Sequence, residues 1–223
     1  MTGNSPPWMG KWAHDLRGPL SPIQSALFLL RHGGVEGAER DELFDLIDRQ
    51  MRRLTGMIDE IGDWVRADQG RLLTRRGSID LVQMIEASRG LGATAVEVEY
   101  AGEADGACVL GDASRMANLL STFFWLIAVP AEEADATGRR NVATVEADAA
   151  DVRMSGPLNP AMLAGSTADA LFAEPQPAPL GDGLGLRLLI ASAIAQGHGG
   201  ELGTRPRAGG GTDVVLRLPR APG

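Results

Sequence analysis

The stretch WAHDLRGPLSPI, residues 12–23, decides how the N-terminal part of this sequence folds. From there onward, apolar residues recur at intervals of four and three: Leu16, Leu20, Ile23, Leu27 and Leu30. This spacing lines one face of a helix, which we expect from residue 8 to about residue 31. Gly33 and Gly34 supply its left-handed cap, and Pro19 predicts a kink because proline lacks a backbone N–H.

A second helix is expected from about Ala38 to Ala67. Its apolar residues follow an unbroken three-four heptad: Phe44, Ile47, Met51, Leu54, Ile58, Ile61 and Val65. Two such helices in tandem form a hairpin, and their apolar faces are too wide to cover each other alone. We therefore predict that two copies of the hairpin pair into a four-helix bundle, which makes the protein a homodimer.

The composition changes after residue 78, where helices and strands begin to alternate irregularly. The expected elements are helices at 79–92, 112–129 and 183–196, and strands at 94–100, 107–110, 141–147, 151–155, 200–206 and 212–219. This mixture predicts an α/β sandwich, in which helices cover one sheet. The fold class is therefore α + α/β, with the helical hairpin in residues 1–75 and the sandwich in residues 76–223.

The composition also argues against several classes of protein. The formal net charge is -8 and the 21 basic residues are spread along the chain, which argues against a nucleic-acid partner. The single cysteine, Cys108, cannot form an intrachain disulfide, and the N-terminus lacks the pattern of a secretion signal. The longest apolar run, residues 119–129, is too short to cross a bilayer, and no residue cluster has metal-ligand spacing. We expect a cytoplasmic protein without membrane insertion and without a metal site.

Four motifs in a fixed order resemble those of bacterial sensor histidine kinases. They are HDLRGPLSPI at 14–23, GDASRMANLLSTFF at 111–124, LFAEPQPAP at 171–179 and the glycine-rich tail at 181–219. The similarity covers nearly the whole chain, and the histidine motif and the tail are specific as a pair. The resemblance implies a dimerisation and phosphoacceptor hairpin followed by an ATPase-type, Bergerat-like domain.

Chemistry explains the residues around His14. A phosphoryl acceptor must be nucleophilic and accessible near neutral pH, and imidazole meets this requirement without special tuning. Asp15 can fix the ring tautomer by a hydrogen bond, while Arg17 and Lys11 bring positive charge near the phosphoryl oxygens. We therefore expect His14, Asp15 and Arg17 to be the catalytic residues. Gly18 stands where related kinases have the residue that positions a hydrolytic water, so phosphoryl passage is favoured over hydrolysis.

The second domain departs from the family where the family binds nucleotide. Asp112 and Arg115 align with the family's asparagine box. Thr122 and Leu126 then take the positions of the asparagines that hold magnesium, and leucine offers no oxygen ligand. In the first glycine box, Met154 replaces an aspartate that reads adenine. Little or no binding of ATP is therefore expected, and neither ATP nor magnesium is expected as a cofactor.

Other positions of the second domain have structural interpretations. Leu158 replaces the second glycine of the first glycine box. The second glycine box survives, and we interpret its members as vestigial turn and packing positions, although their backbone amides could cradle an anion. These members are Gly181, Gly183, Gly185 and Thr212. His198 is expected at a helix end, and Phe123, Phe124 and Trp125 are expected in the core or as filler of the former nucleotide pocket.

The sequence thus predicts a phosphorelay protein. His14 receives a phosphoryl group from the aspartyl phosphate of one receiver domain of a response regulator and gives it to the aspartate of another. Receiver domains would dock on the bundle surface at Arg17, Ser21 and Gln24, and the second domain would form a further docking wall and a lock on the bundle.

Two alternatives remain open. One is an autophosphorylating histidine kinase that uses ATP and magnesium, in which case the nucleotide motifs are aligned wrongly by a few residues. The other is a non-catalytic adaptor that binds a response regulator and holds it. The adaptor would keep its effect when His14 is replaced with alanine, whereas a phosphotransferase would lose its activity.

Overall fold

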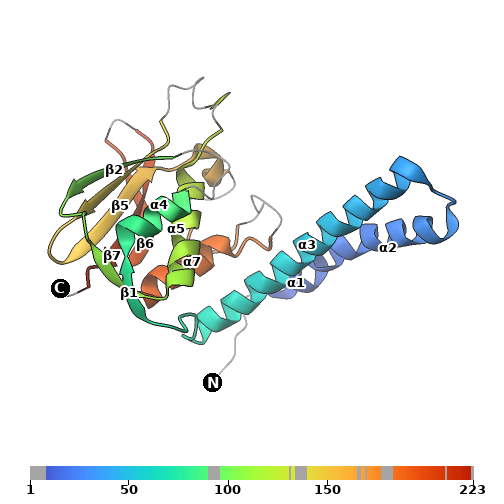
Figure 1. The fold of residues 1–223 in the computed structure, drawn as a ribbon, viewed down its shortest axis with the longest axis horizontal. Helices are drawn as coiled ribbons and strands as arrows, with labels where there is room; N and C mark the ends of the chain where they lie inside the picture. The colour runs from blue at the N-terminus through green and yellow to red at the C-terminus, as the bar shows by residue number, and fades with distance from the viewer. Residues whose placement is uncertain are drawn as a thin grey trace.

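The N-terminal region is a helical hairpin, as predicted. The computed structural model describes residues 9–89, 96–130, 132–133, 140–164, 167–168, 170–176, 183–208 and 210–221. Helices α1 (Met9–Asp15) and α2 (Arg17–His32) form one arm, and the long helix α3 (Gly37–Asp68) forms the other. The hairpin extends away from the second domain, and the C-terminal end of α3 leads into that domain (Figure 1).

The first arm is interrupted at Leu16, between α1 and α2. In a continuous helix the residue at position 19 would donate its N–H to the carbonyl of Asp15, but Pro19 has no N–H. Leu16 still donates its own N–H to the carbonyl of Trp12 at 2.9 Å. The arm is therefore divided just before the proline and directly after the segment that carries His14, while Leu16 itself keeps helical dihedral angles.

The end of α2 differs from the prediction in one detail. Gly33 has a right-handed φ of -86°, and only Gly34 adopts the left-handed region, with φ at 61°. The N–H of Gly33 still bonds to the carbonyl of Leu29 at 2.6 Å, so the helical conformation continues through the first glycine. One left-handed residue is enough to turn the chain toward α3.

The second domain contains two sheets and the helices that pack on them. Its elements are β1 (Gly77–Asp80), α4 (Leu81–Arg89), β2 (Glu97–Gly102), β3 (Cys108–Gly111), α5 (Ala113–Ile127), β4 (Val142–Ala147), β5 (Asp151–Pro157), η1 (Pro160–Leu163), α7 (Arg187–Gly197), β6 (Glu201–Pro206) and β7 (Thr212–Pro219). Strands β1 and β3 pair antiparallel, and the larger sheet has the order β2-β4-β5-β7-β6. Helices α4, α5 and α7 lie on one side of the larger sheet (Figure 1). The predicted order of a helical hairpin followed by an α/β sheet domain is confirmed.

Two boundaries in this domain differ from the sequence prediction. The helix expected at 79–92 begins only at Leu81, because Ile79 belongs to β1 and pairs with Val109 of β3. The helix expected from residue 183 begins at Arg187. Gly185 has a φ of 80°, which is incompatible with a right-handed helix and keeps the preceding segment as a loop.

Helix α5 is the centre of the core. Its residues Leu119, Leu120 and Phe123 are fully buried, which confirms that the longest apolar run of the sequence is a buried helix. Among the described helices, none is both long enough and apolar enough to cross a lipid bilayer.

The hairpin and the second domain share one hydrophobic core. Met57 of α3 is buried in the same cluster as the core residues of α5 and α7, and Ile61 and Trp64 of α3 pack against that cluster. These residues follow each other by four and three positions, so one face of the C-terminal half of α3 is turned toward the second domain. This packing fixes the direction in which the hairpin leaves the domain.

The burial of α5 predicts the effect of shortening a core leucine. We expect Leu120→Ala to lower the free energy of unfolding by about 2 to 5 kcal/mol, because it removes buried methyl groups and leaves a cavity. Leu110→Ala makes the same chemical change at a position that is 54% exposed, and should cost less than about 1 kcal/mol. Urea unfolding of both variants measures the difference, and equal losses would contradict the assignment of α5 to the core.

Candidate functional site

His14 lies in the last turn of α1 and is open to solvent. Its side chain is 91% exposed, and its Nδ1 lies 3.2 Å from Oδ1 of Asp15. When Nδ1 carries the ring proton and donates it to Asp15, the lone pair of Nε2 is free to act as a nucleophile. The sequence expectation for Asp15 thus has a matching contact in the structure.

A pocket of about 550 Å³ opens beside His14 and is walled by both parts of the molecule. The hairpin contributes Lys11, Trp12, Asp15, Gly18, Arg53 and Met57 in addition to His14, and the second domain contributes Glu174, Pro175, Gln176, Gly183 and Leu184. The cationic side chains of Lys11 and Arg53 therefore line the same pocket as the imidazole. Such charges suit the oxygens of a phosphoryl group.

Arg53 was missed by the sequence analysis. It lies on α3, far along the chain from His14, and no local motif surrounds it. Only the pairing of α3 with the first arm brings it to the pocket. A sequence argument would have needed the relative register of the two arms, which the heptad pattern does not specify.

The three residues predicted to bind a partner lie on α2. Arg17, Ser21 and Gln24 are all exposed, and their spacing of four and three places them on one face of that helix. None of the three is among the described residues that line the pocket at His14. They form a surface that extends from the pocket along α2, and they do not contribute to the pocket itself.

The positions that correspond to magnesium ligands in the family lie inside the core. Leu126 is 0% exposed and has only carbon atoms to offer. Thr122 is also buried, and its hydroxyl donates to the carbonyl of Asn118 at 2.9 Å. In the described part of the chain, no group of three or more His, Cys, Asp or Glu side chains could hold a metal ion. These positions do not fit a magnesium ion, because it requires hard oxygen ligands.

The position corresponding to the adenine-reading aspartate is apolar and buried. Met154 lies within β5, opposite Val145 of β4 and Leu216 of β7, and Leu158 follows the end of that strand. Neither side chain can accept a hydrogen bond from an amino group as a carboxylate does. The residues that line this part of the domain therefore do not fit an adenine ring bound in the manner of the family.

The loop of residues 183–186, hereafter the glycine loop, carries Gly183 and Gly185 directly before α7. Its amides are directed at a carboxylate of the hairpin: the N–H of Leu184 donates to Oε2 of Glu60 at 2.7 Å. Burial raises the pKa of Glu60, and hydrogen bonds from the backbone of Leu184 and Leu186 lower it without cancelling the effect of burial. The anion held by this loop is thus a side chain of the protein.

The two remaining members of the second glycine box are placed differently. Gly181 lies outside the described residues. Thr212 is the first residue of β7, and its carbonyl accepts the N–H of Leu158 at 2.9 Å. Its role in the structure is therefore to join β7 to the segment after β5.

Arg187, the first residue of α7, packs toward α5. Its guanidinium carbon lies 4.4 Å from the centre of the Trp125 ring, and its Nε donates to the hydroxyl of Thr122 at 3.3 Å. Phe123 and Phe124 are buried in the core. The prediction that these aromatic residues belong to the core or fill space is confirmed for the two phenylalanines, while Trp125 supports the arginine.

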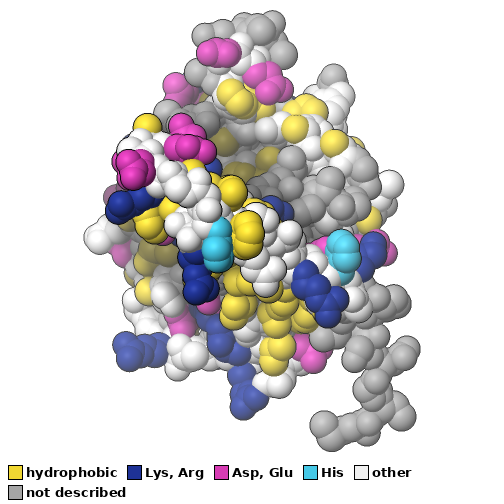
Figure 2. Space-filling view, turned by 90° about the vertical axis from the view of Figure 1, so that its right-hand side faces the viewer, with side chains coloured by type: hydrophobic (Ala, Val, Ile, Leu, Met, Phe, Trp, Pro, Cys, Tyr) yellow, Lys and Arg dark blue, Asp and Glu magenta, His cyan; other side chains and the backbone are white. Residues whose placement is uncertain are grey.

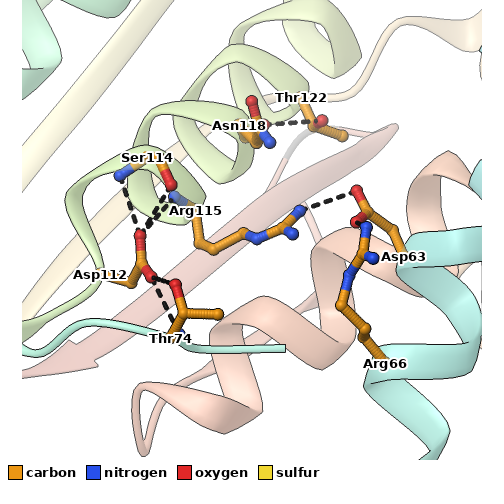
Figure 3. A network of polar contacts seen from close by, with 8 residues as sticks. All are labelled: Asp63, Arg66, Thr74, Asp112, Ser114, Arg115, Asn118 and Thr122. Atoms are coloured by element: carbon orange, nitrogen blue, oxygen red, sulfur yellow. Dashed lines mark hydrogen bonds and ion pairs between the residues drawn. The ribbon is translucent and has the colours of Figure 1, made fainter. Parts of the chain in front are cut away.

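Asp112 joins the segment after α3 to the start of α5 (Figure 3). One carboxylate oxygen accepts hydrogen bonds from the backbone N–H and hydroxyl of Ser114, and the other accepts from the backbone N–H groups of Thr74 and Arg75. Burial raises the pKa of Asp112, but these hydrogen bonds outweigh burial and hold the pKa well below its usual range. Its backbone N–H donates to Nε2 of buried His198 at 3.0 Å. His198 is the C-cap of α7, as predicted.

A second link in Figure 3 joins α3 to α5 by charge. Arg115 of α5 donates to Asp63 of α3 at 2.7 Å, and Arg66 donates to the other oxygen of the same carboxylate at 2.6 Å. Burial raises the pKa of Asp63, but the two arginines lower it further than burial raises it. Arg115 aligns with a family motif, yet its contact here is with the hairpin.

The comparisons with known proteins agree with this architecture. The model of the His Kinase A (phospho-acceptor) domain matches residues 8–70. The Acinetobacter baumannii histidine kinase AdeS is similar in structure, with a TM-score of 0.61 and 16% identity over 93% of this chain and 97% of that chain. Histidine kinase ThkA, in complex with the response regulator protein TrrA, has a TM-score of 0.62 and 18% identity over 96% of this chain and 61% of that chain. Full-length ShkA in complex with AMPPNP has a TM-score of 0.57 and 20% identity over 98% of this chain and 47% of that chain.

At these identities the structural likeness concerns the fold, and no curated protein matches the sequence. The fold is that of histidine kinases, a helical hairpin followed by an α/β sheet domain. Residues 8–70 match the model of the His Kinase A phosphoacceptor domain, and the resemblance of the chain to sensor histidine kinases is confirmed.

The hydrogen bonds of Asp112 predict a pH-dependent contribution to stability. A carboxyl group whose pKa is lowered on folding stabilises the protein above its unfolded pKa, and this stabilisation is lost as the pH falls. We expect Asp112→Asn to lower the free energy of unfolding by about 1 to 3 kcal/mol at pH 7. The difference in the free energy of unfolding between the wild type and this variant should shrink below about pH 5. In this range the Asp112 carboxyl group of the unfolded wild type takes up a proton, while that of the folded protein stays ionised.

Urea unfolding between pH 3 and 7 measures this effect, with the exposed residue Asp45 providing the matched control Asp45→Asn. The free energy of unfolding of Asp45→Asn should match that of the wild type at every pH in this range. A loss for Asp112→Asn that is independent of pH would show that the effect comes from altered packing and not from the carboxylate charge.

Proposed function

We propose that this protein is a phosphorelay intermediate. His14 accepts a phosphoryl group from the aspartyl phosphate of one receiver domain and passes it to the aspartate of another, without ATP or magnesium as cofactors. The observation that carries the proposal is the pairing of an accessible His14–Asp15 site with a second domain whose former ligand positions are apolar and buried. The proposal includes a cytoplasmic location and a functional division into residues 1–75 and 76–223.

The proposed reaction is a pair of phosphoryl transfers. Nε2 of His14 attacks the phosphorus atom, a P–N bond forms, and the bond to the aspartyl oxygen breaks with its electron pair leaving on the carboxylate. Nδ1 keeps its proton, and Asp15 stabilises the positive charge of the phosphorylated ring. In the second transfer a carboxylate of the next receiver attacks phosphorus and the P–N bond breaks. Lys11 and Arg53 are close enough to the pocket to attract the phosphoryl oxygens.

The docking surface for the receiver domain extends over both parts of the molecule. Arg17, Ser21 and Gln24 offer an exposed face of α2 next to His14. The segment of Glu174, Pro175 and Gln176 provides an opposite wall at the same pocket. ThkA, which has a similar fold, is seen in complex with a response regulator protein, and this supports a receiver domain as the partner.

The homodimer is part of the proposal and rests on how the heptad is buried. The residues Ile47, Leu54 and Ile61 of α3 are half-buried within the protein. The alternate apolar positions are Phe44, Met51, Ile58 and Val65, which are 39% to 55% exposed and recur every seven residues. Figure 2 shows hydrophobic side chains exposed among Lys and Arg side chains on the face that includes the hairpin. A second copy of the hairpin would cover this face and complete a four-helix bundle.

Transfer of labelled phosphate tests the phosphorelay. The protein is incubated with a phosphorylated receiver domain and, separately, with labelled ATP and magnesium. We expect label on the protein only from the receiver, and we expect His14→Ala to reduce it to background because the nucleophile is gone. His32→Ala removes the other exposed histidine of the hairpin and should leave transfer unchanged.

The alternatives give different results in the same experiment. Label from ATP alone would identify an autophosphorylating kinase and overturn the proposal. An effect on the receiver that persists in His14→Ala, with no label on the wild type, would identify a non-catalytic adaptor.

Introducing a charge into the exposed heptad tests the homodimer. We expect Met51→Lys to convert a dimer into a monomer, since the ammonium group would be buried among the apolar side chains of the second copy. Glu42→Lys introduces the same side chain at an exposed position outside the heptad core and should remain a dimer. Sedimentation equilibrium measures the mass, and a monomeric wild type at micromolar concentration would refute this arrangement.

A further inference from the structure

We propose that the glycine loop is a carboxylate-binding site whose resident ligand is Glu60 of α3. The loop and Glu60 lie far apart in the sequence and belong to different parts of the molecule. Their contact makes Glu60 a positioning residue that holds the second domain beside His14. The importance of this position for phosphoryl transfer rests on the function proposed above, whereas the contact itself does not.

The geometry is that of a carboxylate held by a backbone amide. Leu184 donates its N–H to Oε2 of Glu60 at 2.7 Å. The neighbouring Gly183 lies directly against the same carboxyl group, so the loop backbone closes around it. Hydrogen bonds from N–H groups to a charged acceptor are stronger than those between neutral groups.

The closeness of this contact leaves no room for a side chain at position 183 while Glu60 stays in place. A Cβ atom at Gly183 would overlap both carboxylate oxygens of Glu60. The φ of Gly183 is not in the left-handed region, so the backbone itself would accept alanine. The absence of a side chain at this position is therefore explained by the approach of Glu60 and not by backbone strain.

A positive charge that acts on this carboxylate also comes from the glycine-loop side of the molecule. Arg187 follows the loop directly, and its charge lowers the pKa of Glu60. It is held in place by the ring of Trp125 and the hydroxyl of Thr122. The amide of Leu184 and the charge of Arg187 both favour the ionised form of Glu60, although burial still raises its pKa. A phosphate group could bind the amide of Leu184 only by displacing Glu60.

The contact reaches the pocket at His14 through the loop. Gly183 and Leu184 line that pocket, and the carbonyl of Gly185 accepts the N–H of Gln176 at 3.0 Å. Gln176 belongs to the wall opposite α2. Holding the loop on α3 thereby sets where this wall lies relative to the imidazole.

Amide hydrogen exchange of the full chain, followed residue by residue by NMR, tests the contact. We expect Glu60→Ala to reduce the protection of the Leu184 amide by about tenfold or more, since this amide loses its acceptor. Asp59→Asn removes the neighbouring, exposed carboxylate and should leave the Leu184 amide protected. Sodium formate, compared with sodium chloride at equal ionic strength, should restore part of the protection in Glu60→Ala. Unchanged protection in Glu60→Ala, or recovery that is the same in both salts, would overturn the proposal.

A double-mutant cycle gives a second, independent test. Gly183→Ala should lower the melting temperature of the wild type, because the new methyl group meets the Glu60 carboxylate. In the Glu60→Ala background, Gly183→Ala should lower the melting temperature only slightly, since the opposing side chain is gone. Additive effects of the two substitutions would contradict the contact.

Neither test involves phosphoryl transfer, so their outcomes are separate from those of the His14 experiment. If the Leu184 amide and the cycle behave as expected while His14 takes no label from a receiver, the contact stands and the phosphorelay fails. If label transfer succeeds but the Leu184 amide is unaffected, the phosphorelay stands and Glu60 has no positioning role.

Discussion

The rest of the structure depends on the packing of α3 in two environments at once. Along its N-terminal half, α3 covers the first arm of the hairpin with one set of heptad positions. Along its C-terminal half, it packs into the core of the second domain through Met57, Ile61 and Trp64. Because a helix is a stiff rod, these two contacts together determine how the hairpin and the α/β domain are oriented. The ion pair of Asp63 and Arg115 and the hydrogen bond from Leu184 to Glu60 add specific polar contacts to this interface.

This orientation determines which parts of the molecule surround His14. His14 lies where the first arm passes the junction of α3 with the second domain, so the pocket beside it receives walls from both. The imidazole itself needs only Asp15 and solvent access, and both are local properties of α1. The wider pocket is a property of the whole chain. The second domain therefore contributes to the histidine site through the residues with which it lines this pocket.

Local physics explains which features could be predicted from the sequence. The heptad of α3, the apolar run of α5 and most of the strands depend on periodicity within short windows, and the structure has them where they were expected. Pro19 predicted that the first arm is interrupted, but it did not predict that the interruption lies at Leu16. The pairing of β1 with β3 was missed because Ile79 lies next to a helix of similar hydrophobicity. Contacts that join distant segments, such as Glu60 with the glycine loop and Arg53 with the pocket of His14, leave no periodic signal.

The positions that correspond to the family's nucleotide ligands belong to the hydrophobic core of this protein. Leu126, Met154 and Leu158 are buried among apolar neighbours, and each contributes to the same hydrophobic cluster. An asparagine at position 126 would bury its amide without a partner, and burying such a group destabilises the fold unless its hydrogen bonds are satisfied. An aspartate at position 154 would place a charge between two strands of the sheet. A nucleotide site of the family's kind at these positions would thus require several simultaneous changes, together with removal of the Glu60 carboxylate from the glycine loop. The centre of the domain is accordingly filled by the packing of its own side chains.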